Sequence, residues 1–297
     1  GWYTDLTAGI KIDINTIPTG SVTYYAHWIL PCRAFREDSW DTIIDNIKAN
    51  PHAYEYACQK EVPLDYNNDG ETDEYTYVRL VNTTTPTECS DPEYSQSSCG
   101  IVIEFNRTVG KASMNPDPED NTTILNGYGN VGGWKYSSIR QYLNNDIYNA
   151  LPQDLKNVII DTKIKAGNGC LDSDSLATPP TCRLYDNGGQ PYITVDKLYL
   201  ASAREIFGKK EGEIYWYEVY DTADEYTRQF DYYKEKNQKH GQGYIYVTTD
   251  KWWLRSPNNL NSVSFNYVDN NGQYGSYIAS DPSSRKYGVV PYVRIGK

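Results

Sequence analysis

The stretch WWLRSPNNLNSVSFNYVDNNGQYGSYIASDPSSRKYGVVPYVRI, residues 252–295, decides the fold of this chain. Its first three residues predict an apolar strand, and the alternation of apolar and polar side chains over 263–268 predicts a second one. The residues DNNG at 269–272 are typical of a hairpin turn, and 289–295 predict a closing strand. We therefore expect the carboxyl end to be built from short strands and tight turns.

Helical patterns lie further toward the amino end. Residues 38–50 (DSWDTIIDNIKAN) carry apolar side chains at one-turn spacing behind a polar cap, which predicts an amphipathic helix. Apolar spacing predicts further helices over 137–147 and 153–160, and the capping-box pair Ser202 and Glu205 predicts a shorter one. The hydrophobic run at 22–35 predicts a strand that ends at a bend at Pro31, and further strand-like segments lie at 75–81, 101–105 and 197–200. Helices first and strands last predict an α+β fold, with helices packed on a twisted antiparallel sheet and hairpins at the carboxyl end.

The domain organisation is expected to be simple. A length of 297 residues allows one large domain or two smaller ones, and without an internal repeat we expect one. Residues 1–20 are a lead-in or edge strand, and 21–297 form the domain. Its expected insertions are an acidic hairpin at 62–81, a disulfide loop at 170–182 and a Tyr-rich excursion at 211–250 with a short helix at 224–233.

Composition limits the classes of partner. The chain has 29 Tyr against 5 Phe and a single Met, and tyrosine suits binding surfaces, although most of these residues also fit half-buried strands. The 39 acidic and 28 basic side chains leave a net charge of −11, which repels phosphate backbones and anionic membranes. No apolar stretch approaches the roughly 18 residues of a membrane span. We therefore expect no nucleic-acid partner and no membrane insertion of this segment.

The six cysteines occur without a C-x-x-C pair, which favours disulfides over a zinc site. Two pairs are local and lie within Pro/Ser/Asp-rich loops, and the remaining two cysteines are left for each other. The predicted disulfides are Cys89–Cys99, Cys170–Cys182 and Cys32–Cys58. Such bonds persist only in an oxidising compartment, which predicts an extracellular location. Six reduced, buried cysteines in a cytosolic protein are the alternative.

Residues 65–73 (DYNNDGETD) place oxygen donors at alternate positions around a sharp turn at Gly70. A hard cation needs several converging oxygens, so this spacing predicts a structural Ca²⁺ that braces the loop. The twelfth position of an EF-hand loop is Thr76 here and not the bidentate Glu, and the alternative is a solvated acidic hairpin turn. The candidate metal ligands are Asp65, Asn67, Asp69, Glu71 and Asp73.

Catalytic motifs are sparse. The histidines, His27, His52 and His240, are scattered, so no clustered imidazole metal site is predicted. The sequence has no G-x-S-x-G elbow, P-loop or dinucleotide fingerprint, and no carboxylate pair stands out as in a glycosidase. We predict that the chain is not an enzyme, and a glycan-processing enzyme is retained as an alternative.

The segment from Asn258 to Tyr287 has an unusual composition. Asn, Ser, Tyr, Asp and Gly dominate it, and Lys and Glu are almost absent. Rigid aromatic anchors among adaptable hydrogen-bonding groups are typical of an antibody-like binding surface. A polar loop region without a ligand would have the same composition, so the composition alone leaves both interpretations open.

Several stretches resemble a known family. They are GGWKYSSIRQYLNNDIYNALPQDLKNVIIDTKI at 132–164, TVDKLYLASAREIFG at 194–208, WWLRSP at 252–257 and YGVVPYVRI at 287–295. Together they resemble a C-type-lectin-like surface domain found in gut Firmicutes, related to formylglycine-generating enzymes and to the variable proteins of diversity-generating retroelements. The resemblance covers most of residues 20–297 and implies a C-type-lectin-like fold. It implies no catalysis, because formylglycine-generating enzymes use a cysteine pair near the carboxyl end and this chain has no cysteine after Cys182.

The same resemblance implies that 258–287 is a variable binding face between two framework segments. In the retroelement proteins, adenine-directed mutagenesis alters Asn-type codons of a C-terminal stretch. Asn270 and Gln273 are further candidates for variation, although Gln is not reached from an Asn codon by changing adenines. The residues expected to contact ligand are Asn258, Asn259, Asn261, Ser264, Asn266, Tyr274, Ser276, Tyr277, Ser280, Asp281, Ser283 and Tyr287.

These features predict an extracellular receptor or adhesin domain on a bacterial cell surface or a phage particle. Its partner would be a protein or glycan ligand on another cell or on a host surface. The alternative from a different class is a structural module of a large bacterial surface protein, without a ligand of its own.

Overall fold

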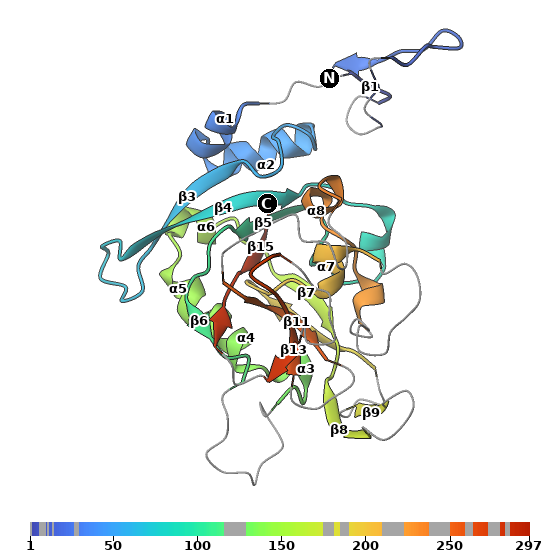
Figure 1. The fold of residues 1–297 in the computed structure, drawn as a ribbon. Helices are drawn as coiled ribbons and strands as arrows, with labels where there is room; N and C mark the ends of the chain where they lie inside the picture. The colour runs from blue at the N-terminus through green and yellow to red at the C-terminus, as the bar shows by residue number, and fades with distance from the viewer. Residues whose placement is uncertain are drawn as a thin grey trace.

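The chain folds into short helices around several mainly antiparallel sheets (Figure 1), which confirms the α+β class. The computed structural model describes residues 2–5, 10, 12–13, 15–26, 30–115, 129–174, 181–184, 190–209, 223–237, 250–258, 264–272, 280–282 and 286–297. The helices are α1 (Cys32–Glu37), α2 (Trp40–Ala49), η1 (Thr87–Ser90), α3 (Gly133–Tyr136), α4 (Ser138–Tyr142), η2 (Leu143–Ile147), α5 (Tyr148–Ala150), α6 (Gln153–Lys156), α7 (Ala203–Phe207), η5 (Asp224–Tyr226) and α8 (Asp231–Glu235). The strands are β1 (Trp2–Tyr3), β2 (Tyr25–Ala26), β3 (Gln59–Leu64), β4 (Glu74–Asn82), β5 (Ile101–Phe105), β6 (Lys111–Ala112), β7 (Thr162–Ala166), β8 (Cys170–Asp174), β9 (Thr181–Leu184), β10 (Tyr192–Asp196), β11 (Trp252–Pro257), β12 (Ser264–Val268), β13 (Ser280–Pro282), β14 (Tyr287–Gly288) and β15 (Tyr292–Ile295).

Two sheets form the centre of the molecule. One has five strands in the order β13-β12-β11-β14-β6, and the other has four in the order β15-β5-β4-β3. The carboxyl end passes from the first sheet to the second, because β14 pairs with β11 and β6 whereas β15 pairs with β5. The β11–β14 pair is parallel, which departs from the expected antiparallel sheet. The last residues of the chain therefore join the two sheets.

Helix α2 confirms the amphipathic helix predicted over 38–50. The Ser39 side chain caps it by accepting a 3.2 Å hydrogen bond from the amide of Thr42. Trp40, Ile43, Ile44 and Ile47 are buried as their spacing requires. The helix predicted over 137–147 is also present as the continuous run α4, η2 and α5, in which η2 is a π-helical turn.

Tertiary pairing overrides several local predictions. Helix α6 ends at Lys156 because the chain beyond it pairs with the last strand, where the amide of Ile160 donates a 3.0 Å hydrogen bond to the carbonyl of Arg294. Residues 197–200 form no strand, and Tyr199 instead makes an isolated bridge with Tyr292. Of the strand predicted before the bend at Pro31, β2 is present over Tyr25–Ala26, and the chain after Pro31 forms helix α1.

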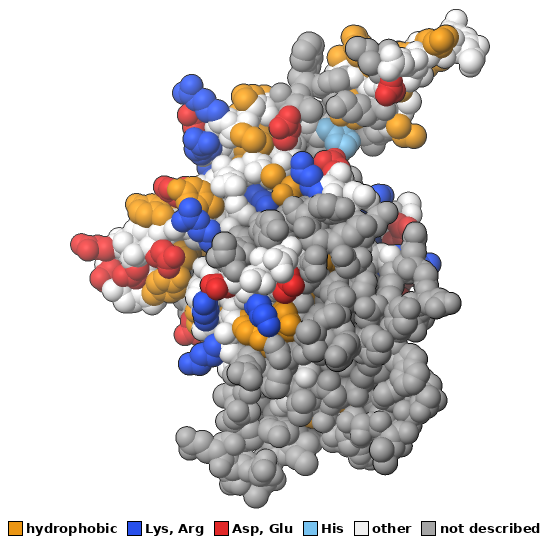
Figure 2. Space-filling view, in the orientation of Figure 1, with side chains coloured by type: hydrophobic (Ala, Val, Ile, Leu, Met, Phe, Trp, Pro, Cys, Tyr) orange, Lys and Arg blue, Asp and Glu red, His pale blue; other side chains and the backbone are white. Residues whose placement is uncertain are grey.

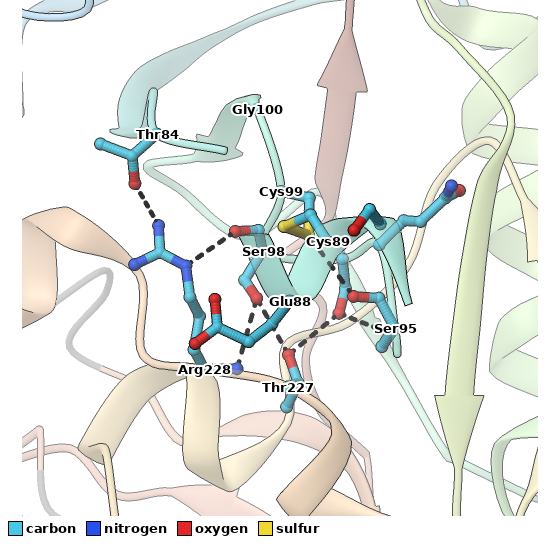
Figure 3. The surroundings of a disulfide bond; sticks show 12 residues. Thr84, Glu88, Cys89, Ser95, Ser98, Cys99, Gly100, Thr227 and Arg228 are labelled. Atoms are coloured by element: carbon cyan, nitrogen blue, oxygen red, sulfur yellow. Dashed lines mark hydrogen bonds between the residues drawn. A yellow bond between two sulfur atoms is a disulfide. The ribbon is translucent and has the colours of Figure 1, made fainter. Parts of the chain in front are cut away.

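Two of the predicted disulfides are present. Cys32–Cys58 and Cys89–Cys99 have S–S distances of 2.00 and 2.01 Å. Cys170 is disulfide-bonded as well, and the side chain of its predicted partner Cys182 lies outside the described residues. Around Cys89–Cys99, Arg228 donates from Nε to the carbonyl of Ser98 at 3.3 Å (Figure 3), so the disulfide loop is fastened to the segment before α8.

Two fully buried carboxylates, Glu104 and Glu205, are each neutralised by an arginine. Arg255 holds Glu205 in a bidentate pair with distances of 2.5 and 2.7 Å, and Arg79 holds Glu104. Tyr233 donates a 2.7 Å hydrogen bond to Glu104, so part of the segment predicted as a Tyr-rich excursion packs into the core. Among the described residues, none of the helices combines the length and apolar character that a bilayer crossing requires.

Candidate functional site

The predicted binding segment, residues 258–287, lies between strand β11 and Gly288 of strand β14, both of which are buried. All six residues of β11 are buried, and Trp252 is paired with Gly288 across β11 and β14. The amide of Gly288 donates a 2.8 Å hydrogen bond to the carbonyl oxygen of Lys251. Lys251 and Gly288, which flank the stretch from β11 to β14, are therefore held side by side. The segment 258–287 lies within this closed stretch, after β11.

Asn130 fastens the root of the β11–β12 connection. The amide of Asn258 donates to the carbonyl of Ser264 at 3.0 Å, which closes the connection. The Asn130 Nδ2 group donates to the carbonyls of both residues, at 2.7 and 2.8 Å, and its Oδ1 accepts from the amide of Cys170 at 2.9 Å. Gly169 lies against this clamp with a φ of +68°, and a Cβ there would lie 1.7 Å from the carbonyl oxygen of Asn130. One buried amide side chain thus joins three segments that are distant in sequence.

Three of the predicted ligand residues are not on the surface. Asn258, Ser264 and Asn266 have exposed fractions of 8, 6 and 2 %. The alternation in 263–268 led us to expect one solvent-facing side of the strand, whereas every residue of β12 is buried. The strand is covered on both faces, so these three side chains do not present themselves to a partner in this structure.

The structure places the backbone of three further predicted ligand residues. Ser280 and Asp281 lie on β13, where their backbones pair with Asn266 and Phe265 of β12. Tyr287 is half-buried on β14. Outside the described residues, or outside the described side chains, lie Asn259, Asn261, Gln273, Tyr274, Ser276, Tyr277, Ser280, Asp281 and Ser283.

Tyr287 belongs to an aromatic group that sequence reasoning missed. Its ring centroid lies 4.7 Å from that of Trp253 and 5.3 Å from that of Tyr267. The Nζ of Lys251 lies 4.6 Å from the Tyr267 ring and 5.3 Å from the Tyr287 ring, within cation–π range. Trp253 and Tyr267 are buried, so Lys251 and Tyr287 form the accessible edge of this group. The only signal in the sequence was the position of Lys251 immediately before the framework strand.

The charge of Lys251 is maintained in this setting. Its partial burial lowers the pKa, but a 3.3 Å hydrogen bond to the Tyr267 hydroxyl and the nearby Tyr287 more than offset this effect and raise the pKa above the ordinary lysine value. An aromatic edge with a fixed cation can contact planar, polar or anionic groups of a ligand.

The acidic loop at 65–73 closes the β3–β4 hairpin, and acidic side chains gather at its projecting tip (Figure 2). Asp65 accepts hydrogen bonds from the amides of Asp69 and Gly70 at 3.2 and 2.9 Å, and Asp73 accepts from the amide of Tyr66 at 2.7 Å. The carboxylates are thus turned toward the loop's own backbone. Within the part of the chain that the structure describes, no three His, Cys, Asp or Glu side chains gather as metal ligands would. The donor types suit Ca²⁺.

A protein-family model described as a domain of unknown function, DUF6273, matches residues 119–295, more than half of the chain. The chain belongs to the DUF6273 family. The DUF6273 region contains the Asn130 clamp and the aromatic group, and it begins after the acidic loop and after Cys89–Cys99. Its strand β15 pairs with β5, which precedes the matched range, so the DUF6273 region and the upstream segment share one sheet. Searches of curated proteins and of solved structures found no match.

Proposed function

We propose that this chain is an extracellular ligand-binding domain of C-type-lectin-like fold, a receptor or adhesin domain on a bacterial surface or a phage particle. Residues 258–287 form its binding face, and the partner is a protein or glycan on another cell or on a host surface. The observation that carries the proposal is the hydrogen bond between Gly288 and Lys251, which closes the longer stretch containing β11 and this segment. A scaffold of this kind tolerates changes in the excursion without losing its core.

Two further features support the proposal. Cys32–Cys58 and Cys89–Cys99 suit an oxidising, extracellular compartment. Tyr287 and Lys251 offer an aromatic edge beside a cation, which suits recognition of a polar partner. A structural Ca²⁺ at 65–73 would brace the acidic loop, far in sequence from the binding face, and it belongs to the proposal as a separate and independently testable part.

The burial of Asn258, Ser264 and Asn266 narrows the face to the rest of the segment. The same burial favours the rival function, a structural module without a ligand, because part of the polar segment serves packing. Sequence variation discriminates between the two: a retroelement-diversified face would show substitutions at Asn-type codons between fixed framework codons, with an adenine-rich template copy nearby in the genome. A structural module would vary evenly across the segment.

The direct test is a binding screen against glycans and surface proteins with matched tyrosine variants. The double variant Tyr274→Ala/Tyr277→Ala removes two aromatic anchors of the proposed face, and Tyr75→Ala removes an exposed tyrosine, 54 % accessible, on the β3–β4 hairpin. We expect the double variant to raise the Kd of the best ligand about tenfold or more, with Tyr75→Ala unchanged. Equal binding by all three proteins, or a melting temperature that falls by several degrees in the double variant alone, would contradict the proposal.

A further inference from the structure

A concave site lies near the carboxyl terminus. A hollow of about 710 Å³ is bordered by the end of α2, by residues 83–86 after β4 and by residues 294–297 at the end of β15. In Figure 1, the carboxyl terminus lies between α2 and β15, and β13 lies below it in this view. The volume falls within the range of about 300–1,000 Å³ that is usual for small-molecule sites.

The charge of this hollow is opposite to that of the chain. The chain carries a net charge of −11, yet the lining contains no Asp or Glu. Its charged or titratable side chains are Lys48, His52, Arg294 and Lys297. The nearest acidic partners reach Lys297 from outside the lining, at 3.4 Å from Asp41 and 3.1 Å from Asp45. Basic side chains also gather below α2 in the surface view (Figure 2).

Arg294 is the unusual member of this set. Its Nε donates to the carbonyl of Cys99 at 2.7 Å and its Nη1 to Oε1 of Gln96 at 3.3 Å, and both acceptors are neutral. Burial lowers the pKa of Arg294, which reflects the loss of solvation around its charge. Four other arginines with largely covered side chains each pair with a carboxylate: Arg79 with Glu104, Arg140 with Asp196, Arg228 with Asp231 and Arg255 with Glu205.

Within the described residues, Arg294 has no carboxylate partner of this kind. A guanidinium that is already partly desolvated in the folded protein binds an anion favourably, because binding adds charge-assisted hydrogen bonds and requires little further desolvation of the arginine. The third nitrogen of the group, Nη2, lies close to the backbone at Gly100, where a Cβ would stand 4.0 Å from it and 3.7 Å from Oγ1 of Thr85. Gly100 thus leaves space between a guanidinium edge and an exposed hydroxyl.

The floor of this space is rigid. Gly100 follows Cys99 of the disulfide with Cys89 (Figure 3), and its amide donates a 2.9 Å hydrogen bond to the carbonyl of Thr84. Apolar side chains complete the lining beside the basic groups, among them Ile47, Ile101 and Ile295. A ligand that fits this lining has an oxyanion at one end and a compact organic body that covers apolar surface.

We propose that this hollow binds a small organic anion, with its carboxylate or sulfate held by Arg294 and Lys48 and its body packed against the isoleucines. This site is separate from the binding face at 258–287, and each proposal is tested independently of the other. A carboxylate and a sulfate would both supply the oxyanion, and the probes below distinguish between them.

Isothermal titration calorimetry of the full chain tests the proposal with glucuronate, glucose 6-sulfate, glucose and inorganic sulfate. We expect one or both charged sugars to bind with a Kd of about 1 mM or tighter, glucose to show no binding, and the affinity to fall as ionic strength rises. Preference for glucuronate identifies a carboxylate ligand, and preference for the sulfated sugar identifies a sulfate ligand. Equal binding of inorganic sulfate would overturn the organic ligand, and equal binding of glucose would overturn the role of charge.

Charge variants connect the binding to this hollow. We expect Arg294→Gln to weaken binding about tenfold or more and Lys48→Gln by about two- to fivefold, because both remove a cation from the lining. Lys236→Gln is the matched control, since it removes an exposed lysine outside the hollow and outside residues 258–287. Arg294 also supports the Cys99 carbonyl, so the double variant Lys48→Gln/Thr85→Val, at two exposed positions, decides the question if Arg294→Gln fails to fold. Unchanged affinity in that double variant would overturn the proposal, as would the absence of binding by both charged sugars.

Discussion

The amide of Gly288 and the carbonyl oxygen of Lys251 meet in a 2.8 Å hydrogen bond, although a long polar segment separates them in sequence. Because strands β11 and β14 run parallel at this point, the chain must travel away from the sheet and return before the bond can form. The bond therefore closes the stretch that contains β11, β12 and the proposed binding face at 258–287.

Replacing Gly288 by alanine is expected to weaken this closure. A Cβ at this position would lie 2.3 Å from Cγ2 of Thr108 and 3.2 Å from the carbonyl oxygen of Lys251. Overpacking of this kind costs about 1–3 kcal/mol, so the free energy of unfolding measured in urea should fall by that amount. Gly20→Ala is the control, because no atom lies within 4 Å of its Cβ position, and a Gly288→Ala variant as stable as this control would contradict the closure argument.

Asn130→Ala should loosen the root of the β11–β12 connection. The substitution removes the side-chain donor that the carbonyls of Asn258 and Ser264 share, although the Ser264 carbonyl keeps its bond from the amide of Asn258. Each lost hydrogen bond costs about 0.5–1.5 kcal/mol. Hydrogen exchange should become at least about tenfold faster at the amide of Asn258, which donates to Ser264.

Asn144→Ala is the matched control for this variant. Its Nδ2 donates to the carbonyls of Arg140 and Leu198 at 3.0 and 2.9 Å, and its Oδ1 accepts from the amides of Lys197 and Leu198. The variant therefore also removes an amide side chain that joins separate segments, in another part of the fold. If both variants accelerate exchange at Asn258 equally, Asn130 has no special role at the binding face.

Calcium should stabilise the protein if the loop at 65–73 holds an ion. Saturation at about a hundred times the Kd would add roughly 2.7 kcal/mol to the free energy of unfolding. We expect a chelator to lower the melting temperature and added Ca²⁺ to restore it, and the double variant Asp65→Asn/Asp69→Asn to abolish the response. A melting temperature that is the same with chelator and with Ca²⁺ would leave the loop as a solvated acidic turn.

Stability should fall at alkaline pH because buried tyrosines resist ionisation. Burial, together with a hydrogen bond to Asp38, raises the pKa of Tyr54 to about 12, and burial raises the pKa of Tyr94 to about 12. A folded-state pKa above the unfolded value of 10.0 means that their contribution is complete below pH 10 and is lost as the pH rises through 12. Urea unfolding at a series of pH values should show this decline.

Tyr54→Phe tests the sign of that effect. The variant loses the 2.6 Å hydrogen bond to Asp38 and should be less stable than the wild type at neutral pH. Because phenylalanine cannot ionise, the difference in unfolding free energy should shrink between pH 10 and pH 12. A difference that stays constant or grows over this interval would show that Tyr54 does not contribute as its raised pKa requires.

Local patterns predicted those elements that are stabilised by contacts between residues close together in the sequence. Ser39 capping α2 and Ser202 capping α7 are contacts within one turn, and both appear as expected. The local disulfide Cys89–Cys99 is also present. The DNNG turn follows the same rule, with Gly272 at a φ of +72° donating to the carbonyl of Asp269.

The candidate site was less predictable because burial depends on distant segments. The residue types of Asn258, Ser264 and Asn266 suggested solvent exposure, and only the packing around β12 shows that they are covered. The position of Lys251 before the framework strand did not indicate that it lies near two tyrosine rings, since β14 has to bring Tyr287 to it from the far end of the segment.

The sequence by itself determined the α+β class, the main helix, two disulfides and the presence of short strands at the carboxyl end. Their determinants are hydrogen bonds, caps and apolar spacings that act over a few residues. Only the tertiary structure decided which polar side chains are buried, that Asn130 joins three segments, and that Arg294 faces a basic hollow without a carboxylate partner among the described residues. Solvation and ion pairing depend on which distant segments come together, and that is set by the packing of the whole chain.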